Sequence, residues 1–185
     1  MKKRTAMIMA LVMTASTMFA GTAFAEAEAE EAAAEAVELS WDMVADKAAE
    51  VEGDFVTFDE IAVKIWVPAE MQAVELTEED VENGYIGYFS NEEKGWNMAV
   101  VYANVEGMSI EEYTAELEGM DDVTEIEAGV VNGLPCVSYM MPENESANIA
   151  FATEQGYILE VTLAPTSDEE FGTYASLITC SIQAE

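Results

Sequence analysis

Apolar and polar side chains alternate along much of the chain after residue 54, with the period of two that is typical of β-strands. The clearest run covers residues 61–67, in which every second side chain is aliphatic. One face of this strand is therefore apolar, whereas Lys64 and Trp66 lie on the other, more polar face. Residues 55–58 read as a second short strand, which we expect to pair with the first.

Three further pairs of strand-like segments each flank a short turn sequence. These pairs are residues 85–90 and 96–104, residues 123–131 and 134–141, and residues 147–153 and 157–164. The turn between the middle two segments is Asn132-Gly133, whose residues both accept the positive φ angles of a type I′ turn. We therefore expect three antiparallel hairpins.

Helix start signals interrupt these strands. Ser109 and Glu112 have the spacing of a capping box, and so do Ser167 and Glu170. Each is followed by apolar residues at helical spacing, which predicts a helix with one face for packing on a sheet. Ser40 is the expected cap of a shorter helix near the start of the patterned region.

The order of hairpins, helix, hairpins and helix predicts one α+β domain over residues 39–185. We expect a largely antiparallel sheet of hairpins flanked by helices. A domain of roughly 150 residues buries enough apolar surface to fold without disulfides.

The first 25 residues have the three parts of a secretory signal peptide. Lys2, Lys3 and Arg4 form a basic start, residues 6–20 are uncharged and mostly apolar, and an Ala-x-Ala site ends at Ala25. The apolar run is shorter than the roughly 20 residues that a membrane-spanning helix needs. We expect cleavage after Ala25, and hence a secreted or extracytoplasmic protein.

Residues 26–38 consist of Glu and Ala with a single Val. This composition offers no apolar face whose burial would offset the entropy of ordering, so we interpret the segment as an acidic spacer.

Acidic residues dominate the chain after the predicted signal peptide, with 38 Asp and Glu against Lys47, Lys64 and Lys94 alone. Nucleic acid is excluded as a partner, because binding to the phosphate backbone depends on Lys and Arg. An anionic membrane surface is disfavoured for the same reason. The charge keeps a secreted protein dispersed, and weak cation binding and adaptation to salt stay open as further interpretations.

The order of elements, together with the segments FVTFDEIAVKIWVP, MSIEEYTAEL and VNGLPCVSY, resembles the PsbP-like fold over most of residues 54–182. The photosystem II extrinsic protein, a Ran-binding import factor and DcrB-type bacterial periplasmic proteins share that fold. The resemblance implies a three-layer α/β/α sandwich of a secreted bacterial type. It implies no activity and no cofactor, and the basic patches of a Ran partner are absent from this sequence.

The residue inventory excludes several catalytic classes. The chain has no His, so a Ser-His-Asp or Cys-His arrangement has no imidazole to accept the proton of its nucleophile. Ser90 and Lys94 miss the S-x-x-K spacing of serine acyltransferases, and we expect Lys94 to stay solvated and protonated in a turn. A hydrolase needs only two carboxylates, so an extracellular carboxylate-only hydrolase stays open as the alternative.

Metal and ligand candidates each have a simpler structural interpretation. Residues 78–80 and residues 121–122 are dense in acids, but neither segment has the loop sequence of a calcium site. Thr77 explains the first cluster as a helix cap with an acidic first turn. Trp41, Trp66 and Trp96 are more typical of core positions than of a ligand groove, although Trp66 stands on the polar side of its strand. No catalytic, cofactor-binding or metal residue is assigned.

Cys136 and Cys180 are the only cysteines, so a single disulfide is possible in a secreted chain. Cys180 lies about half a turn from the apolar stripe of the last helix, which would point its sulfur away from the sheet that carries Cys136. We therefore expect two unpaired thiols and interpret Cys136 as a small buried core residue.

Taken together, these observations favour a secreted, strongly acidic, non-enzymatic binding module. Its partner is a protein, a cell-wall component or a small molecule, among which the sequence does not choose.

The signal peptide generates the first testable prediction. The intact mass of the secreted product should match a chain that begins at Glu26, because the Ala-x-Ala site precedes it. A product that retains residues 1–25 in a membrane fraction would show that the segment is an anchor instead.

Overall fold

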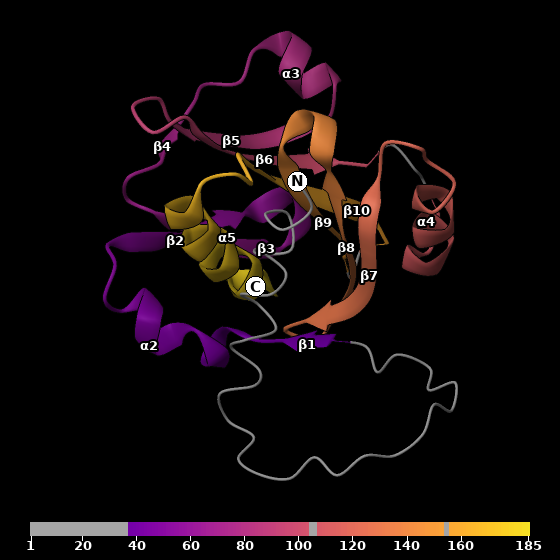
Figure 1. Cartoon of the computed structure of the whole chain (residues 1–185), viewed down its shortest axis with the longest axis horizontal. Coiled ribbons are helices and arrows are strands. Elements are labelled where there is room, and N and C mark those ends of the chain that lie inside the picture. Colours follow the sequence, from indigo (N-terminus) through magenta and orange to yellow (C-terminus); the bar gives the residue numbers. More distant parts are fainter. Residues whose placement is uncertain (1–36, 104–106, 154–155) are drawn as a thin grey trace, which may run out of the picture.

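The computed structural model describes residues 37–103, 107–153 and 156–185, which form two β-sheets and several helices (Figure 1). The predicted signal peptide and residues 26–36 of the predicted spacer lie outside the described residues. All strand pairs except one are antiparallel within this part of the chain. The α+β class with a largely antiparallel sheet, as predicted from the sequence, is therefore confirmed.

The larger sheet has eight strands in the order β1-β7-β8-β9-β10-β6-β5-β4. All three predicted hairpins are present: β5 (Tyr85–Asn91) with β6 (Trp96–Tyr102), β7 (Thr124–Val131) with β8 (Leu134–Met141), and β9 (Ser146–Ala152) with β10 (Ile158–Ala164). The hairpins join through β8–β9 and β10–β6 pairing. At the two edges lie β4 (Gln72–Ala73), antiparallel to β5, and β1 (Val37–Leu39), parallel to β7.

The smaller sheet has three strands in the order β11-β3-β2. Strand β2 (Gly53–Phe58) pairs with β3 (Val63–Pro68), as predicted, and β11 (Gln183–Ala184) adds the last residues of the chain. A 3-10 turn, η2 (Asp59–Ile61), joins β2 to β3. Ile61 therefore belongs to the connection and not to the strand that the alternating pattern assigned to it.

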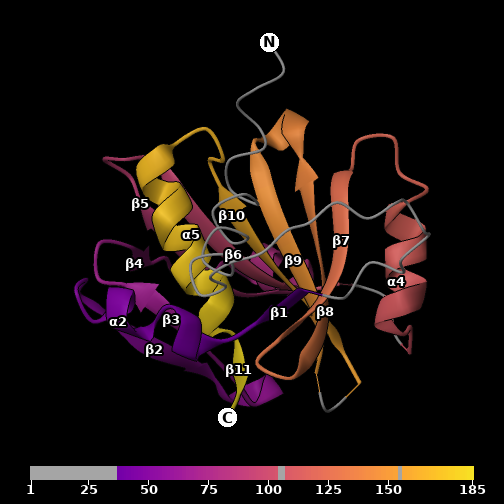
Figure 2. The same ribbon diagram turned by 60° about the horizontal axis from the view of Figure 1, so that its bottom comes forward.

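The two faces of the larger sheet are covered differently (Figure 2). Helix α4 (Ile110–Leu117) lies over β7, β8 and β9 and buries Ile110, Tyr113 and Leu117 there. Helix α5 (Glu169–Ser181) lies on the opposite face, and the smaller sheet packs against α5 through β3. One face is thus covered by a helix, and the other by a helix together with a second sheet.

The caps of these helices agree only in part with the sequence pattern. Ser109 accepts a hydrogen bond from the backbone N–H of Glu112, and the predicted capping box of α4 is complete. The cap of α5 is Asp168 and not the predicted Ser167. Asp168 accepts the N–H of Phe171 at 2.9 Å and also the indole N–H of Trp96 at 3.3 Å, a tertiary contact that no local motif contains.

The short helices near the N-terminal end also differ from the prediction. The segment after Ser40 divides into η1 (Trp41–Met43) and α2 (Ala45–Ala48), and the Ser40 side chain makes no capping bond. Elsewhere in the chain, α3 (Glu78–Glu82) follows β4 and η3 (Pro142–Asn144) connects β8 to β9. Strand β1 includes Val37 and Glu38, which the sequence assigned to the spacer, because pairing with β7 compensates for their weak local pattern.

Helix α5 is buried on two sides because it lies between the two sheets. Its Phe171 ring stacks on Trp96 of β6 with the ring centroids 5.3 Å apart, while the Ser181 hydroxyl accepts the backbone N–H of Trp66 in β3 at 2.8 Å. Cys180 is buried as well, and it belongs to the same core cluster as Cys136. The sequence placed Cys180 off the apolar stripe of the last helix, and its burial there follows from the smaller sheet and η1, which also pack against α5. Both thiols are free in the structure.

The turn between β7 and β8 connects distant parts of the fold. Asn132 and Gly133 have φ angles of 46° and 84°, as the predicted hairpin turn requires. The Asn132 side chain also accepts the backbone N–H of Trp41 at 2.8 Å and donates to the carbonyls of Cys180 and Ile182, each at 2.7 Å. A residue predicted only as part of a turn therefore fixes η1 and the end of α5.

The environment of the two cysteines generates a prediction about their reactivity. Burial raises the pKa of both thiols to about 11, so little thiolate is present at pH 8 and reagents have no access to it. A thiol reagent should therefore modify the native protein slowly at pH 8 and find two free thiols once denaturant is added. Finding none in unreduced, denatured monomer would contradict the unpaired state.

Candidate functional site

A cavity lies beside the edge strand β1, on the face of the larger sheet that α5 covers. Its volume is about 80 Å³. The lining comes from β1, β7, β8, β9, β10 and one turn of α5, and consists of Val37, Leu39, Glu127, Ala128, Gly129, Cys136, Ser138, Tyr139, Met140, Ala147, Asn148, Ile149, Leu163 and Thr179.

Close approach of two strands shapes this cavity. A side chain at Gly129 would bring its Cβ to 2.7 Å from the carbonyl oxygen of Val37, so glycine is required for β1 to pair with β7 at this point. Val37 and Leu39 then form one wall of the cavity. The opposite wall is the row of Cys136, Ser138 and Met140, which alternate along β8 and face the same side.

The cavity is suited to a small apolar group. Almost all of its accessible lining is apolar. A space of about 80 Å³ is well below the roughly 300–1,000 Å³ of pockets for complete small molecules. It is comparable to one aliphatic side chain, since even benzene occupies engineered cavities of about 150 Å³. The cavity therefore fits an apolar anchor that belongs to a larger partner.

One acidic side chain, that of Glu127, is part of the cavity lining. Glu125 is exposed farther along β7, and Glu38 of β1 is exposed on the face opposite to that of Val37 and Leu39. No Lys or Arg occurs anywhere in the sequence after Lys94, so β6 to β10 and α4 contribute acidic charges only. A group that approaches this side of the molecule meets a negative potential.

Cys136 lies in the cavity wall, yet it is unsuited to nucleophilic chemistry. Cys136 is 5% exposed, and burial raises the pKa of its thiol to about 11. An activated cysteine needs a nearby cation that lowers the thiol pKa, and the shift here has the opposite sign. Cys136 is thus a core residue, as the sequence interpretation proposed.

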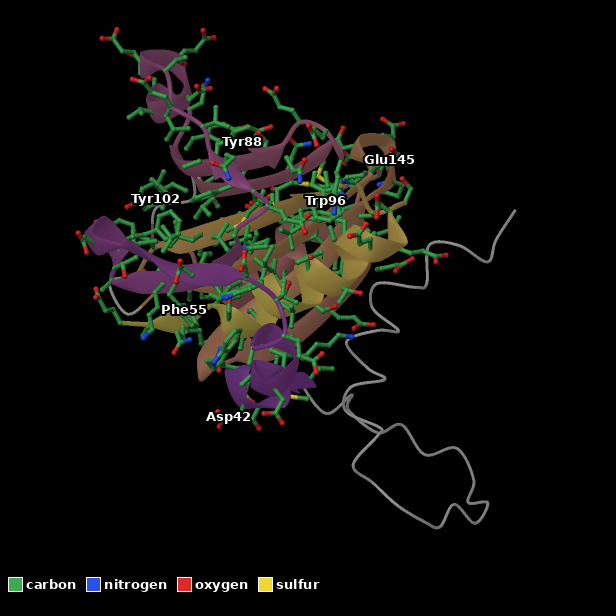
Figure 3. The ribbon with its side chains drawn as sticks, turned by 90° about the vertical axis from the view of Figure 1, so that its left-hand side faces the viewer. Asp42, Phe55, Tyr88, Trp96, Tyr102 and Glu145 are labelled. Atoms are coloured by element: carbon green, nitrogen blue, oxygen red, sulfur yellow. The ribbon has the colours of Figure 1, made fainter. Side chains whose placement is uncertain are left out.

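The tryptophans form core and not a ligand groove. Trp66 shares its strand face with the half-buried Lys64, as predicted, yet it is only 4% exposed because that face is covered. The Trp41 ring covers it at a centroid distance of 6.4 Å, and Phe55 packs edge-on against Trp41. Trp96 is fully buried beside α5. Figure 3 labels Trp96 and also Phe55, which lies on β2 of the smaller sheet.

The ammonium group of Lys94 is ion-paired, whereas the sequence analysis predicts a freely solvated turn residue. Its ammonium group lies 2.6 Å from a Glu70 carboxylate oxygen, 2.9 Å from one of Glu170 and 4.1 Å from the centre of the Trp96 ring. Hydrogen bonds to Glu70 and then Glu170 raise the pKa of Lys94, so it stays protonated, as expected. Its role is to join the β5–β6 turn to the start of α5.

A second, shallower groove is lined by Glu50, Val51, Glu52, Ala69, Glu70 and Tyr174 and has a volume of about 390 Å³. The hydrogen bond from Lys94 lowers the pKa of the Glu70 carboxyl, and the N–H of Phe171 lowers that of Asp168. A general acid for glycoside hydrolysis needs a raised carboxyl pKa. These two carboxyls therefore lack the property that the hydrolase alternative requires.

Of the two acidic clusters noted in the sequence, one begins a helix and the other lies in an exposed turn. Glu78, Glu79 and Asp80 form the first turn of α3, and Thr77 is its N-cap, as expected from the sequence. Thr77 and Asp80 also make a complete capping box, which the sequence analysis did not predict. Asp121 and Asp122 lie exposed in the turn before β7. Within the described residues, no group of three or more acidic or cysteine side chains is placed to hold a metal ion.

One cluster of polar groups could not be found from sequence spacing. The Tyr113 hydroxyl of α4 donates to Glu160 of β10 at 2.9 Å, and Tyr139 of β8 also contacts this carboxylate. Burial, and next the charge of Glu160, raises the pKa of both tyrosines. The cluster secures α4 to the sheet, and its two phenols stay protonated at neutral pH.

Comparisons with known proteins find similarity among solved structures. No protein-family model matches the sequence, and no curated protein matches it. Among solved structures, the solution structure of cyanobacterial PsbP (CyanoP) from Synechocystis sp. PCC 6803 is similar, with a TM-score of 0.48 and 13% identity over 73% of this chain and 94% of that chain. The PsbP-like resemblance stated from the sequence is thus found again. A likeness at this identity concerns the fold alone, and neither activity nor partner follows from it.

Within residues 37–103, 107–153 and 156–185, no helix is both long and apolar enough to cross a bilayer.

The tyrosine cluster generates a prediction about alkaline stability. In the unfolded chain these phenols ionise near pH 10, whereas in the fold their pKa values are higher. The stabilisation is complete below pH 10 and declines as the pH rises, by up to about 1.4 kcal/mol per pH unit for each tyrosine.

Urea titrations between pH 8 and pH 11.5 measure this slope, and Tyr139→Phe should make it shallower although it lowers stability at pH 8. An identical slope in Tyr139→Phe would show that Tyr139 does not titrate differently in the fold.

Proposed function

We propose that this chain is a secreted, non-enzymatic interaction module that holds an apolar side chain of a partner protein in the cavity beside β1. We further propose that it has the three-layer arrangement of PsbP-like proteins. The observation that carries the proposal is the size of the cavity together with its apolar lining and open mouth.

Interfaces concentrate their binding energy in a few apolar or aromatic anchors that fill pockets on the partner. A cavity of about 80 Å³ accepts one such anchor but not a complete metabolite. A protein partner therefore explains the site better than a small molecule does. The walls are already formed by paired strands, so binding requires little ordering of the module itself.

The carboxylate-only hydrolase is the weaker candidate. Glu70 in the shallow groove and Asp168 at the start of α5 have lowered carboxyl pKa values and are held by hydrogen bonds in structural roles. The anchor cavity has a single carboxylate, that of Glu127, in its lining, so it does not supply the paired acid and base of that mechanism.

A leucine side-chain probe tests this function. N-acetyl-leucine methylamide, titrated into the isotope-labelled chain, should shift the amide resonances of Gly129, Cys136 and Ile149 in a saturable manner. The alanine analogue should bind at least about tenfold more weakly, because burial of each further methylene contributes about 0.8 kcal/mol.

Ala147→Phe fills the cavity from β9 and should abolish the shifts. Ala73→Phe is the matched control, because Ala73 is an exposed residue on β4 at the far edge of the same sheet. If the leucine probe leaves the cavity resonances unchanged, or if both variants behave alike, the cavity is not an anchor site.

A further inference from the structure

The dipeptide Asn-Gly occurs twice in the chain, at residues 83–84 and at residues 132–133. An asparagine before glycine is chemically labile in water, because glycine has no Cβ to shield its backbone nitrogen from the asparagine side chain. The two pairs lie in different surroundings. Asn83 is exposed at the end of helix α3, whereas Asn132 is half-buried in the turn between β7 and β8.

The reaction at such a pair needs water but no enzyme. The backbone nitrogen of the glycine gives up its proton and attacks the side-chain carbonyl carbon of the asparagine. The amide nitrogen takes up a proton and leaves that carbon as ammonia, and a cyclic succinimide remains. Water then opens the ring at one of its two carbonyls, which gives either aspartate or isoaspartate, in which the backbone runs through the former side chain. Both products carry a negative charge at neutral pH.

At Asn132 the fold opposes ring closure. The geometry of the turn directs the Gly133 nitrogen away from the Asn132 side chain, so both must rotate before they meet. The side-chain amide is held by three hydrogen bonds, from the N–H of Trp41 and to the carbonyls of Cys180 and Ile182. All three must break before the amide can rotate. Asn132 therefore reacts only in molecules in which these hydrogen bonds have opened.

At Asn83 the fold offers much less resistance. In the described part of the chain, only backbone groups of Asn83 are hydrogen-bonded, and ring closure breaks a single bond, from the Gly84 N–H to the Val81 carbonyl at 3.0 Å. Helix α3 has five residues, none of which is buried, and Figure 1 shows it at the periphery of the molecule. So short a helix is marginally stable in water and opens at little cost.

The same reaction affects the two places unequally. A carboxylate at residue 132 would face the carbonyl oxygens of Cys180 and Ile182, which accept hydrogen bonds from the amide that it replaces. Those carbonyls would lose their donor and meet a charge of the same sign. At residue 83 the new charge would lie in solvent at the C-terminal end of α3, where it is only weakly unfavourable. Conversion at the exposed pair is therefore tolerated, whereas conversion at the other pair makes unfolding irreversible.

We propose that Asn83 is a site of spontaneous covalent modification in the native chain, at which the amide is converted to aspartate and isoaspartate. The fold protects Asn132 from the same reaction until its side-chain hydrogen bonds open. Conversion at the first site accumulates with the age of a folded molecule, and conversion at the second records that the molecule has unfolded. This inference does not depend on what occupies the cavity beside β1.

The test incubates the purified complete chain at pH 8, without urea and in urea, and follows both sites by peptide mass spectrometry with chromatographic separation of isoaspartate. In urea both pairs should convert at comparable rates. Without urea, the rate at Asn83 should stay within about tenfold of its rate in urea, since one backbone hydrogen bond resists it. The rate at Asn132 should fall at least about 100-fold, because three hydrogen bonds must break.

Matched variants at Trp41 test the cause of the protection. Trp41→Pro removes the N–H that donates to Asn132, whereas Trp41→Ala removes the same ring but keeps the N–H. Proline fits this position, because Trp41 is the first residue of η1 and Ser40 before it is extended. Trp41→Pro should raise the native rate at Asn132 by about 3- to 10-fold relative to Trp41→Ala, and both variants should leave the rate at Asn83 unchanged.

The consequence of each conversion is measured with Asn132→Asp and Asn83→Asp, of which the first should lower the melting temperature more. Equal native rates at Asn83 and Asn132 would overturn the proposal, and so would an Asn83 that stays intact in the native chain while it converts in urea. If Asn132 converts alike in Trp41→Pro and Trp41→Ala, its side-chain hydrogen bonds do not protect it and the inference is wrong.

Discussion

The side-chain amide of Asn132 is the contact on which the arrangement of the other elements depends. Its oxygen accepts the N–H of Trp41, and its nitrogen donates to the carbonyls of Cys180 and Ile182. Its backbone N–H adds a bond to the carbonyl of Leu39 at 2.8 Å. One residue thereby joins the β7–β8 turn to the first and last described segments. Because these partners are backbone groups at element ends, which lack ladder or helix partners, removing the amide would leave several of them unsatisfied.

Two consequences follow from these hydrogen bonds of Asn132. The end of α5 is held against the larger sheet while its other side receives the smaller sheet, with Ser181 bonded to the backbone of Trp66. Strand β1 is held at the edge of β7, where Val37 and Leu39 close one wall of the cavity. The candidate site is therefore built by the same contact that positions the second layer, although no part of Asn132 lies in the cavity lining.

The distribution of charge supports a division of the surface into two regions. Lys94 gathers Glu70 and Glu170 around itself and stabilises the start of α5, so the acids there have a cationic partner. The strands and helix that follow Lys94 in the sequence carry acidic side chains but no basic residue. The cavity opens in this second region. Apolar burial supplies affinity at such a site, while the unbalanced acids favour partners of opposite charge.

By itself, the sequence determined the elements whose cause is local. The period of two predicted the hairpins, Asn132-Gly133 predicted their central turn, and Ser109 with Glu112 predicted the start of α4, because each depends on neighbours a few residues away. The absence of His and the excess of acids likewise limited the chemistry before any fold was known. Only the tertiary structure decided the burial of Trp66 and Cys180, the cap at Asp168, the three roles of Asn132 and the pairing of Val37 with Gly129. Each depends on groups that are distant in sequence and meet only when two sheets enclose α5, and the cavity, lined from six separate elements, exists for the same reason.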